Sequence, residues 1–126
     1  MQFGYTILYV PNVLATLKFY EAAFGLTTRF LHEGGDYGEL DTGSTALAFA
    51  AQGLMQQLGK NPQAASAQAP SFEIALCAPD VAQALERAIA AGAKLMRPVE
   101  VMPWGQTIAY VADINGFVVE LCTPVG

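Results

Sequence analysis

The fold is decided by a stretch of sequence that occurs twice, as Tyr5-Thr-Ile-Leu-Tyr-Val-Pro-Asn-Val13 and as Phe72-Glu-Ile-Ala-Leu-Cys-Ala-Pro-Asp-Val81. Each copy is an apolar, strand-like run that leads into an Asx residue followed by valine, which is a typical helix start. Asn12 in the first copy corresponds to Asp80 in the second. A repeat of this length predicts a duplicated supersecondary unit, and the cleft between two such units is a natural place for a binding site.

Both copies continue in the same order. Apolar residues recur at helical spacing up to a glycine that ends the helix: Val13, Leu17, Tyr20 and Phe24 before Gly25, and Val81, Leu85, Ala88 and Ile89 before Gly92. Three extended runs separated by Gly-rich turns follow each helix, at 27–31, 37–41 and 45–51 and at 94–99, 106–112 and 117–122. The sequence therefore predicts an α+β fold of two pseudo-repeated β-α-β-β-β modules.

We expect one domain over residues 1–126, with module one at 1–51, a linker at 52–70 and module two at 71–126. The linker is rich in Ala, Gln, Gly and Pro and has few residues that could join a core. This composition predicts a loop with one helical turn. A plain connector is favoured over a lid that would cover a cleft.

Composition and charge exclude several classes of protein. The 126 residues are 53% hydrophobic and only 13% charged, which is enough apolar material for one buried core. The net charge of -5, without any basic run, argues against nucleic acid and anionic membrane as partners. We expect a cytoplasmic protein, because the sequence shows neither an export signal nor an apolar run of about 20 residues. Cys77 and Cys122 lie in strand-like runs, which predicts buried, reduced thiols.

Three longer motifs lie on this repeat. The first is Asn-Val-x3-Leu-x-Phe-Tyr-x4-Gly-Leu at 12–26, the second is Asp-Val-x3-Leu-x2-Ala-x3-Gly-Ala at 80–93, and the third joins Pro103-Trp-Gly-Gln to Asp-x2-Gly-x2-Val-Glu-Leu at 113–121. Together they resemble the vicinal oxygen chelate superfamily, which includes glyoxalase I, bleomycin-resistance proteins, fosfomycin-resistance enzymes and extradiol dioxygenases. The resemblance covers nearly the whole chain. It implies paired modules whose mixed sheets curl around a cleft, often completed by a second chain, but not one particular reaction.

The resemblance also implies where a metal would bind, because the metal-using members take ligands from the first and last strands of both modules. Aligning the two repeats puts Tyr5 opposite Glu73 and Ala48 opposite Glu120. A catalytic transition metal normally needs about three protein ligands including imidazole, and the single histidine, His32, lies in a Gly-rich turn. We therefore expect no metal cofactor. If a divalent ion binds, Glu73 and Glu120 are its expected ligands.

Glu73 and Glu120 are the candidate catalytic residues. Each is a lone carboxylate in an apolar run, so on a strand it faces either water or the cleft. A buried carboxylate must be paired, protonated or open to a wet pocket. If the two carboxyl groups face each other, the pKa of one of them should be raised, because like charges repel. This would provide an acid, a base or an acceptor for a ligand. The alternative is that Glu120 faces solvent on an edge strand, or bonds to the backbone or a Tyr hydroxyl.

Four further residues complete the predicted ligand-binding set. Trp104 and Gln106 could line a pocket entrance, and Tyr5 could donate its hydroxyl to a ligand or to Glu73. Tyr110 is either a ligand contact or a half-buried strand residue. Arg97 could orient an anionic group, although a surface position is the usual one for arginine.

We predict a homodimer that binds a small organic molecule without a metal, of the drug-sequestering or sensing kind found in bleomycin-resistance relatives. The apolar strands carry few charges that would protect their edges, and the run from Thr45 to Ala51 carries none, which favours a symmetric partner. The alternative is a lyase or isomerase that uses Glu73 or Glu120 as a general base. The sequence leaves open whether any reaction is catalysed, and it does not identify the ligand.

Overall fold

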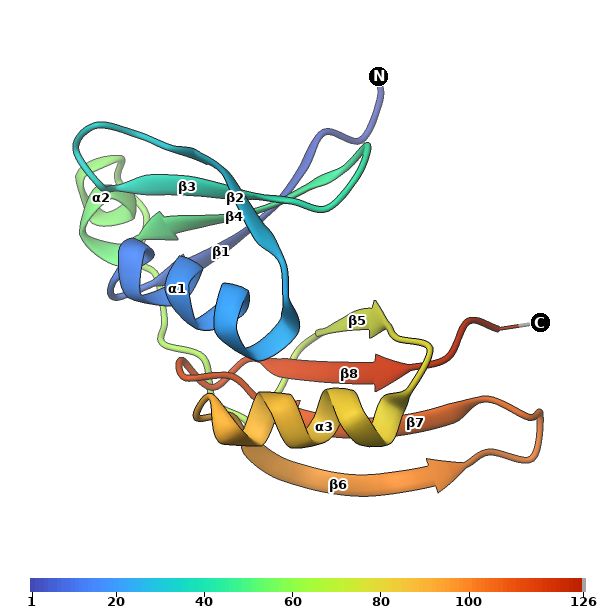
Figure 1. Ribbon diagram of the computed structural model, residues 1–126. Helices are drawn as coiled ribbons and strands as arrows, with labels where there is room; N and C mark the ends of the chain where they lie inside the picture. The colour runs from blue at the N-terminus through green and yellow to red at the C-terminus, as the bar shows by residue number, and fades with distance from the viewer. Residues whose placement is uncertain (126) are drawn as a thin grey trace. The chain divides into compact units, whose positions relative to one another are not determined.

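The structure is a computed structural model that describes residues 1–125, and it divides into two compact units, Met1–Ala64 and Ala65–Gly126. Each unit contains a four-stranded mixed sheet with a long helix on one face (Figure 1). This is the α+β architecture of two β-α-β-β-β modules that the repeat predicts.

The first unit contains β1 (Tyr5–Val10), α1 (Val13–Phe24), β2 (Thr27–Leu31), β3 (Tyr37–Asp41), β4 (Ala46–Ala51) and α2 (Gln52–Gln57). The second contains β5 (Glu73–Cys77), α3 (Val81–Ala90), β6 (Lys94–Val101), β7 (Thr107–Ala112) and β8 (Val118–Cys122). Their sheets have the equivalent orders β1-β4-β3-β2 and β5-β8-β7-β6. In both, the first strand pairs parallel with the last, and the other pairs are antiparallel.

The two long helices begin and end where the sequence places their caps. The Asn12 side chain accepts a hydrogen bond from the Ala15 N–H at 2.9 Å, and the Asp80 side chain accepts one from the Gln83 N–H at 3.1 Å. These bonds satisfy amide donors that the first helical turn leaves unpaired. Gly25 ends α1 with a φ of 71°, a left-handed conformation that glycine adopts without strain.

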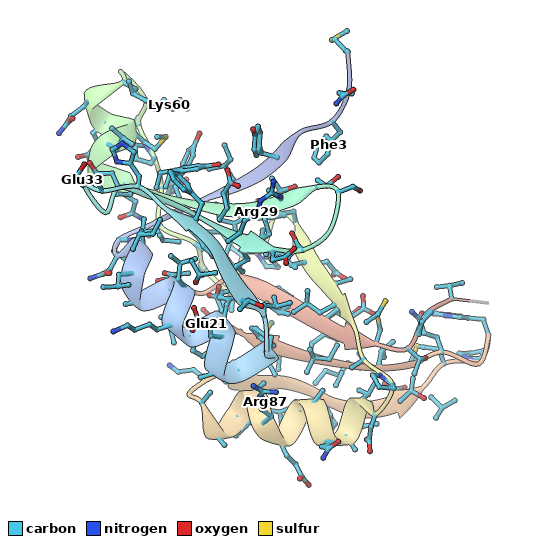
Figure 2. All side chains as sticks on the ribbon, turned by 45° about the horizontal axis from the view of Figure 1, so that its top comes forward. Phe3, Glu21, Arg29, Glu33, Lys60 and Arg87 are labelled. Carbon is cyan, nitrogen blue, oxygen red and sulfur yellow. The ribbon has the colours of Figure 1, made fainter. Side chains whose placement is uncertain are left out.

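One face of each sheet is covered by its helix. In the first unit, the Phe49 ring of β4 packs against Tyr20 of α1 with 5.0 Å between ring centroids. The Thr28 hydroxyl of β2 donates to the carboxylate of Glu21, which lies on α1 (Figure 2). In the second unit, Val81, Leu85 and Ala88 of α3 are buried as predicted.

One prediction about burial is wrong, and one residue of the helical pattern lies outside the core. Ile89 is 42% exposed, because eight residues of helical rotation put it about 80° from Val81, at the margin of the apolar stripe. Cys77 is exposed, because β5 is an edge strand. Cys122, on the interior strand β8, is buried as predicted.

The segment after β4 begins with α2, and Lys60 follows this helix (Figure 2). The Lys60 ammonium group lies 3.1 Å from the Tyr9 hydroxyl and 5.2 Å from the centroid of the Tyr9 ring. This contact joins the start of the segment to β1. No helix among residues 1–125 is long and apolar enough to cross a membrane.

Candidate functional site

The strand register of the second sheet brings the predicted site residues onto one face. Register partners on neighbouring strands point to the same side of a sheet. Three rows of partners cross this face: Glu73, Val118 and Ala112; Ala75, Glu120, Tyr110 and Arg97; and Cys77, Cys122 and Ile108. The residues between them on β8, Val119 and Leu121, are almost completely buried and point to the opposite face. We refer to the face with the three rows as the open face of the second sheet.

Glu120 is the central ionisable group of the open face. It lies on the interior strand β8, between β5 and β7, and is only partly exposed. Burial raises the pKa of its carboxyl group, and a hydrogen-bonding and electrostatic interaction with Glu73 raises it further. The edge-strand part of the alternative for Glu120 is wrong, because β8 lies between β5 and β7. The other part, a bond to a Tyr hydroxyl, agrees with the interaction between Glu120 and Tyr110.

Tyr110 is the third member of this cluster. It is the register partner of Glu120, and its hydroxyl interacts with that carboxyl group in the direction that lowers the Glu120 pKa. The pKa of Tyr110 itself is raised, first by burial and then by the charges of Glu120 and Glu73. Arg97, the next residue in the row, forms an exposed ion pair with Glu100 at 2.9 Å. The cluster of Glu73, Glu120 and Tyr110 can donate and accept hydrogen bonds side by side.

The first sheet has an equivalent face, but its chemistry is different. Tyr5 pairs with Ala46 in the first sheet, as Glu73 pairs with Val118 in the second. Ala48 lies between Ile7 and Glu39. Glu120 has the same position in the second sheet, between Ala75 and Tyr110. The register therefore agrees with the internal alignment of Tyr5 with Glu73 and of Ala48 with Glu120. Tyr5 is 58% exposed, and Ala48 offers no polar group.

A Tyr–Glu pair nevertheless lies on the equivalent face of the first sheet. The Tyr37 hydroxyl donates a hydrogen bond to the Glu39 carboxylate at 2.7 Å. Burial, and then this hydrogen bond, raise the pKa of Tyr37. Glu39 occupies the register position that Tyr110 occupies in the second sheet, so each sheet presents a tyrosine together with a carboxyl group.

Trp104 and Gln106 lie in the turn between β6 and β7, rather than at the start of a strand as expected. The Trp104 indole N–H donates to the Gln106 amide oxygen at 2.9 Å, and the Gln106 amide nitrogen donates to the Thr123 carbonyl at 2.8 Å. Trp104 is 65% exposed. The two side chains are therefore held together just before the start of β7, and Gln106 also contacts the Cys122 thiol.

Residues 3–126 match the family model of the glyoxalase-like domain. The chain belongs to the glyoxalase-like domain family. It is thus a member of the vicinal oxygen chelate superfamily, as the sequence motifs indicate. A sequence search among curated proteins found no significant match.

Solved structures share this glyoxalase-like fold over nearly the whole chain. A glyoxalase-related enzyme from Fulvimarina pelagi is 26% identical, with a TM-score of 0.84, and the match covers 98% of this chain and 88% of that one. A glyoxalase/bleomycin resistance protein/dioxygenase family enzyme from Burkholderia phytofirmans PsJN is 20% identical, with a TM-score of 0.77 and coverage of 95% and 96%. A superfamily member from Sphaerobacter thermophilus is 20% identical, with a TM-score of 0.74 and 98% coverage of both chains.

The donor atoms available to a metal in this glyoxalase-like protein are few. In the part of the chain that the structure describes, no three His, Cys, Asp or Glu side chains lie together as a metal site would require. His32 lies in the turn after β2, where its Nδ1 accepts a hydrogen bond from the Gly34 N–H at 3.2 Å. Of the four positions at which the resemblance implies ligands, Glu73 and Glu120 carry carboxylates, and Tyr5 and Ala48 do not.

Sequence reasoning missed Glu39 and the pairing of Cys77 with Cys122. Glu39 lies on the third strand of its module, whereas the predicted ligand positions lie on the first and last strands. Extending the alignment of the repeats to the third strand matches Glu39 with Tyr110. The cysteine pair carried a signal as well, because Cys77 and Cys122 close the first and last strands of one module, which pair with each other in this fold.

Proposed function

We propose that this protein binds a small organic molecule at the open face of the second sheet, and that it does so without a catalytic transition metal. The observation that carries this proposal is the position of Glu120. A carboxyl group with a raised pKa, on an interior strand, has Glu73 and the Tyr110 hydroxyl beside it. Perturbed titratable groups gathered in this way are typical of functional sites.

The cluster suggests the chemistry of the ligand. Burial and the interaction with Glu73 raise the pKa of Glu120, so this carboxyl group holds its proton to a higher pH than a solvated glutamate. The carboxyl oxygens of Glu73 and Glu120 can accept hydrogen bonds, while the Tyr110 hydroxyl, and Glu120 when it is protonated, can donate. A ligand that carries a hydroxyl group or an amine beside an apolar body fits this set, and Trp104 and Gln106 of the same unit would extend the contact surface.

The available donors support the metal-free part of this proposal. The family's ligand positions hold a tyrosine, an alanine and two glutamates, without an imidazole. Such a set does not fit zinc, nickel or iron, which need about three ligands including nitrogen or sulfur donors. We expect nickel, zinc and manganese to bind no more tightly than at a surface site.

Calorimetry tests the metal-free proposal directly. The expected result for each of the three ions is weak binding that Glu73→Gln and Glu120→Gln leave unchanged. One equivalent bound tightly per chain, and lost in either variant, would overturn the metal-free proposal.

A thermal-shift screen tests ligand binding. Aromatic antibiotics, amines and small hydroxy acids are suitable probes, because a ligand that binds only the folded state raises the melting temperature. A true ligand should raise the melting temperature of the wild type and of Glu86→Gln, whose substitution lies on an exposed position of α3, but not that of Glu120→Gln. Equal shifts in all three proteins would contradict a site at Glu120.

A second candidate function is a lyase or isomerase reaction with Glu120 or Glu73 as general base. The raised pKa of Glu120 favours it, because a general base works best when its pKa lies near the working pH. The relative from Fulvimarina pelagi, described as a glyoxalase-related enzyme, also supports it. Turnover of a compound found in the thermal-shift screen, abolished by Glu120→Gln, would favour the enzyme over the binding protein.

We further propose that the protein is a cytoplasmic homodimer and that a sequestered drug is one class of ligand, which would confer antibiotic resistance. The free thiols of Cys77 and Cys122 are consistent with a reducing compartment.

A further inference from the structure

Cys77 and Cys122 lie side by side on the open face of the second sheet. They are register partners in the parallel pair formed by β5 and β8. Neighbouring strands lie about 4.8 Å apart, within the range of Cα separations that a disulfide spans, about 4.4–6.8 Å. Register partners also point to the same face. Both cysteines are free, so the fold holds two thiols where one bond could join them.

The two thiols differ in how accessible they are. Cys77 is the last residue of the edge strand β5 and is exposed, whereas Cys122 is 4% exposed. Burial is the main cause that raises the pKa of Cys122 to about 11, and the neighbouring Cys77 is the second. Cys122 therefore remains a thiol at neutral pH. The Cys122 thiol donates a weak hydrogen bond to the Leu76 carbonyl at 3.8 Å. An oxidant in solution therefore reaches Cys77 first and Cys122 only through it.

We propose that Cys77 and Cys122 form a reversible disulfide within one chain when the protein meets a small-molecule disulfide. In the first step, the Cys77 thiolate attacks one sulfur of the reagent. A mixed disulfide forms and one reagent thiolate leaves. In the second step, Cys122 gives up its proton and attacks the Cys77 sulfur, which forms the bond between the strands and releases the second reagent thiol. The two cysteines are oxidised, and the reagent is reduced to two thiols.

This bond would fix the edge strand that carries Glu73. Cys77 and Glu73 lie at opposite ends of β5, and both pair with β8. A bond between Cys77 and Cys122 would therefore limit the separation of β5 from β8 beside Glu120. The modification site depends only on the register and exposure of the two thiols, and so it does not rest on the proposed function.

Mass spectrometry after treatment with hydroxyethyl disulfide tests the proposal. The native wild-type chain should lose two hydrogens, without a retained adduct, and peptide mapping should join the segments that contain Cys77 and Cys122. The Cys122→Ser variant should instead accumulate the mixed disulfide on Cys77, and Cys77→Ser should remain unmodified. The oxidised wild type should melt about 10 °C higher than the reduced protein, because the bond closes a long loop in the unfolded chain.

Other results would overturn the proposal. A stable reagent adduct on the wild type, or a disulfide between two chains, would show that the two sulfur atoms do not reach each other in the folded protein. No modification at all would show that Cys77 does not react, and would equally overturn the proposal. If Cys122→Ser fails to fold, peptide mapping of the wild type decides the question. Reduction by dithiothreitol must restore the original mass and melting temperature, since the proposed bond is reversible.

Discussion

Glu120 acquires its properties from residues that are distant in sequence. Its register partners are Ala75 on β5 and Tyr110 on β7, and Glu73 reaches it from the start of β5. Partial burial disfavours the charged carboxylate, Glu73 disfavours it further, and the Tyr110 hydroxyl partly compensates. The result is a carboxyl group that retains its proton to a higher pH than a solvated glutamate.

The Glu120→Gln substitution should make stability less dependent on pH. The folded-state pKa of Glu120 is raised above 4.5, so the folded state holds the proton more tightly than the unfolded chain. The contribution of protonated Glu120 to the stability of the fold is fully present below pH 4.5, and it is lost as the pH rises through the raised pKa of the folded state. Glutamine cannot ionise, so the variant should gain stability relative to the wild type toward neutral pH. Urea unfolding below pH 4.5 and near neutrality measures this difference.

The size and sign of the effect distinguish a site residue from a structural one. At neutral pH, the variant should be as stable as the wild type or more stable. A loss of more than about 2 kcal/mol would mean that the ionised Glu120 is a structural hydrogen-bond acceptor. Glu86→Gln, at an exposed position on α3, is the matched control and should change stability by less than about 0.5 kcal/mol.

At the scale of elements, α1 approaches β3 closely because Gly38 has no side chain. A Cβ atom at Gly38 would lie 2.7 Å from Cδ1 of Leu17, 3.2 Å from Cγ1 of Val13 and 3.3 Å from the Phe30 carbonyl oxygen. Two of these neighbours belong to the apolar stripe of α1. Gly38 also fixes which residues of β3 face away from the helix, because Tyr37 and Glu39 flank it and point to the other side.

The Gly38→Ala substitution should destabilise the protein by about 1–3 kcal/mol, the range expected for overpacking a core. Gly53→Ala is the comparison, because Gly53 lies within α2 and nothing lies within 4 Å of a Cβ atom at that position. It should stabilise the protein by up to about 1 kcal/mol, because alanine forms helix better than glycine. Free energies of unfolding from urea titration give both values. Similar values for the two variants would contradict the tight packing of α1 against β3.

At the scale of the whole molecule, the two units repeat one topology and leave equivalent edges exposed. The strand from Ala46 to Ala51 lies between β1 and β3, so the uncharged run that favoured a dimer is not itself an edge. The edges of the second sheet are β5 and β6. All eight residues of β6 are exposed, among them Leu95 at 52% and Val101 at 68%. A long edge strand with exposed apolar side chains is prone to pair with another chain.

We therefore expect a dimer in solution, with β6 in or near the interface. Sedimentation at micromolar concentration should give about twice the monomer mass of 13.4 kDa. Val101→Lys should weaken the association, because a lysine on an edge strand opposes strand pairing. A monomer of 13.4 kDa for the wild type would contradict the prediction.

The fold could be predicted from signals that lie along the chain. The repeated strand–Asx–helix–glycine pattern depends on hydrophobic periodicity and helix caps, which involve only residues that are close in sequence. These local signals predicted all eight strands, α1 and α3. The same pattern correctly identified Glu73 and Glu120 as equivalent in position to Tyr5 and Ala48, because a duplicated unit preserves strand register.

The assembly of the site, in contrast, depends on contacts between strands that are distant in sequence. Tyr110 joins Glu73 and Glu120, and Cys77 meets Cys122, because β5, β7 and β8 pair across long stretches of chain. Exposure likewise depends on which strands form edges, which is why Cys77 departed from the sequence prediction. Register and edge position are properties of the sheet as a whole, since they arise from contacts between strands rather than from the residues of any one strand.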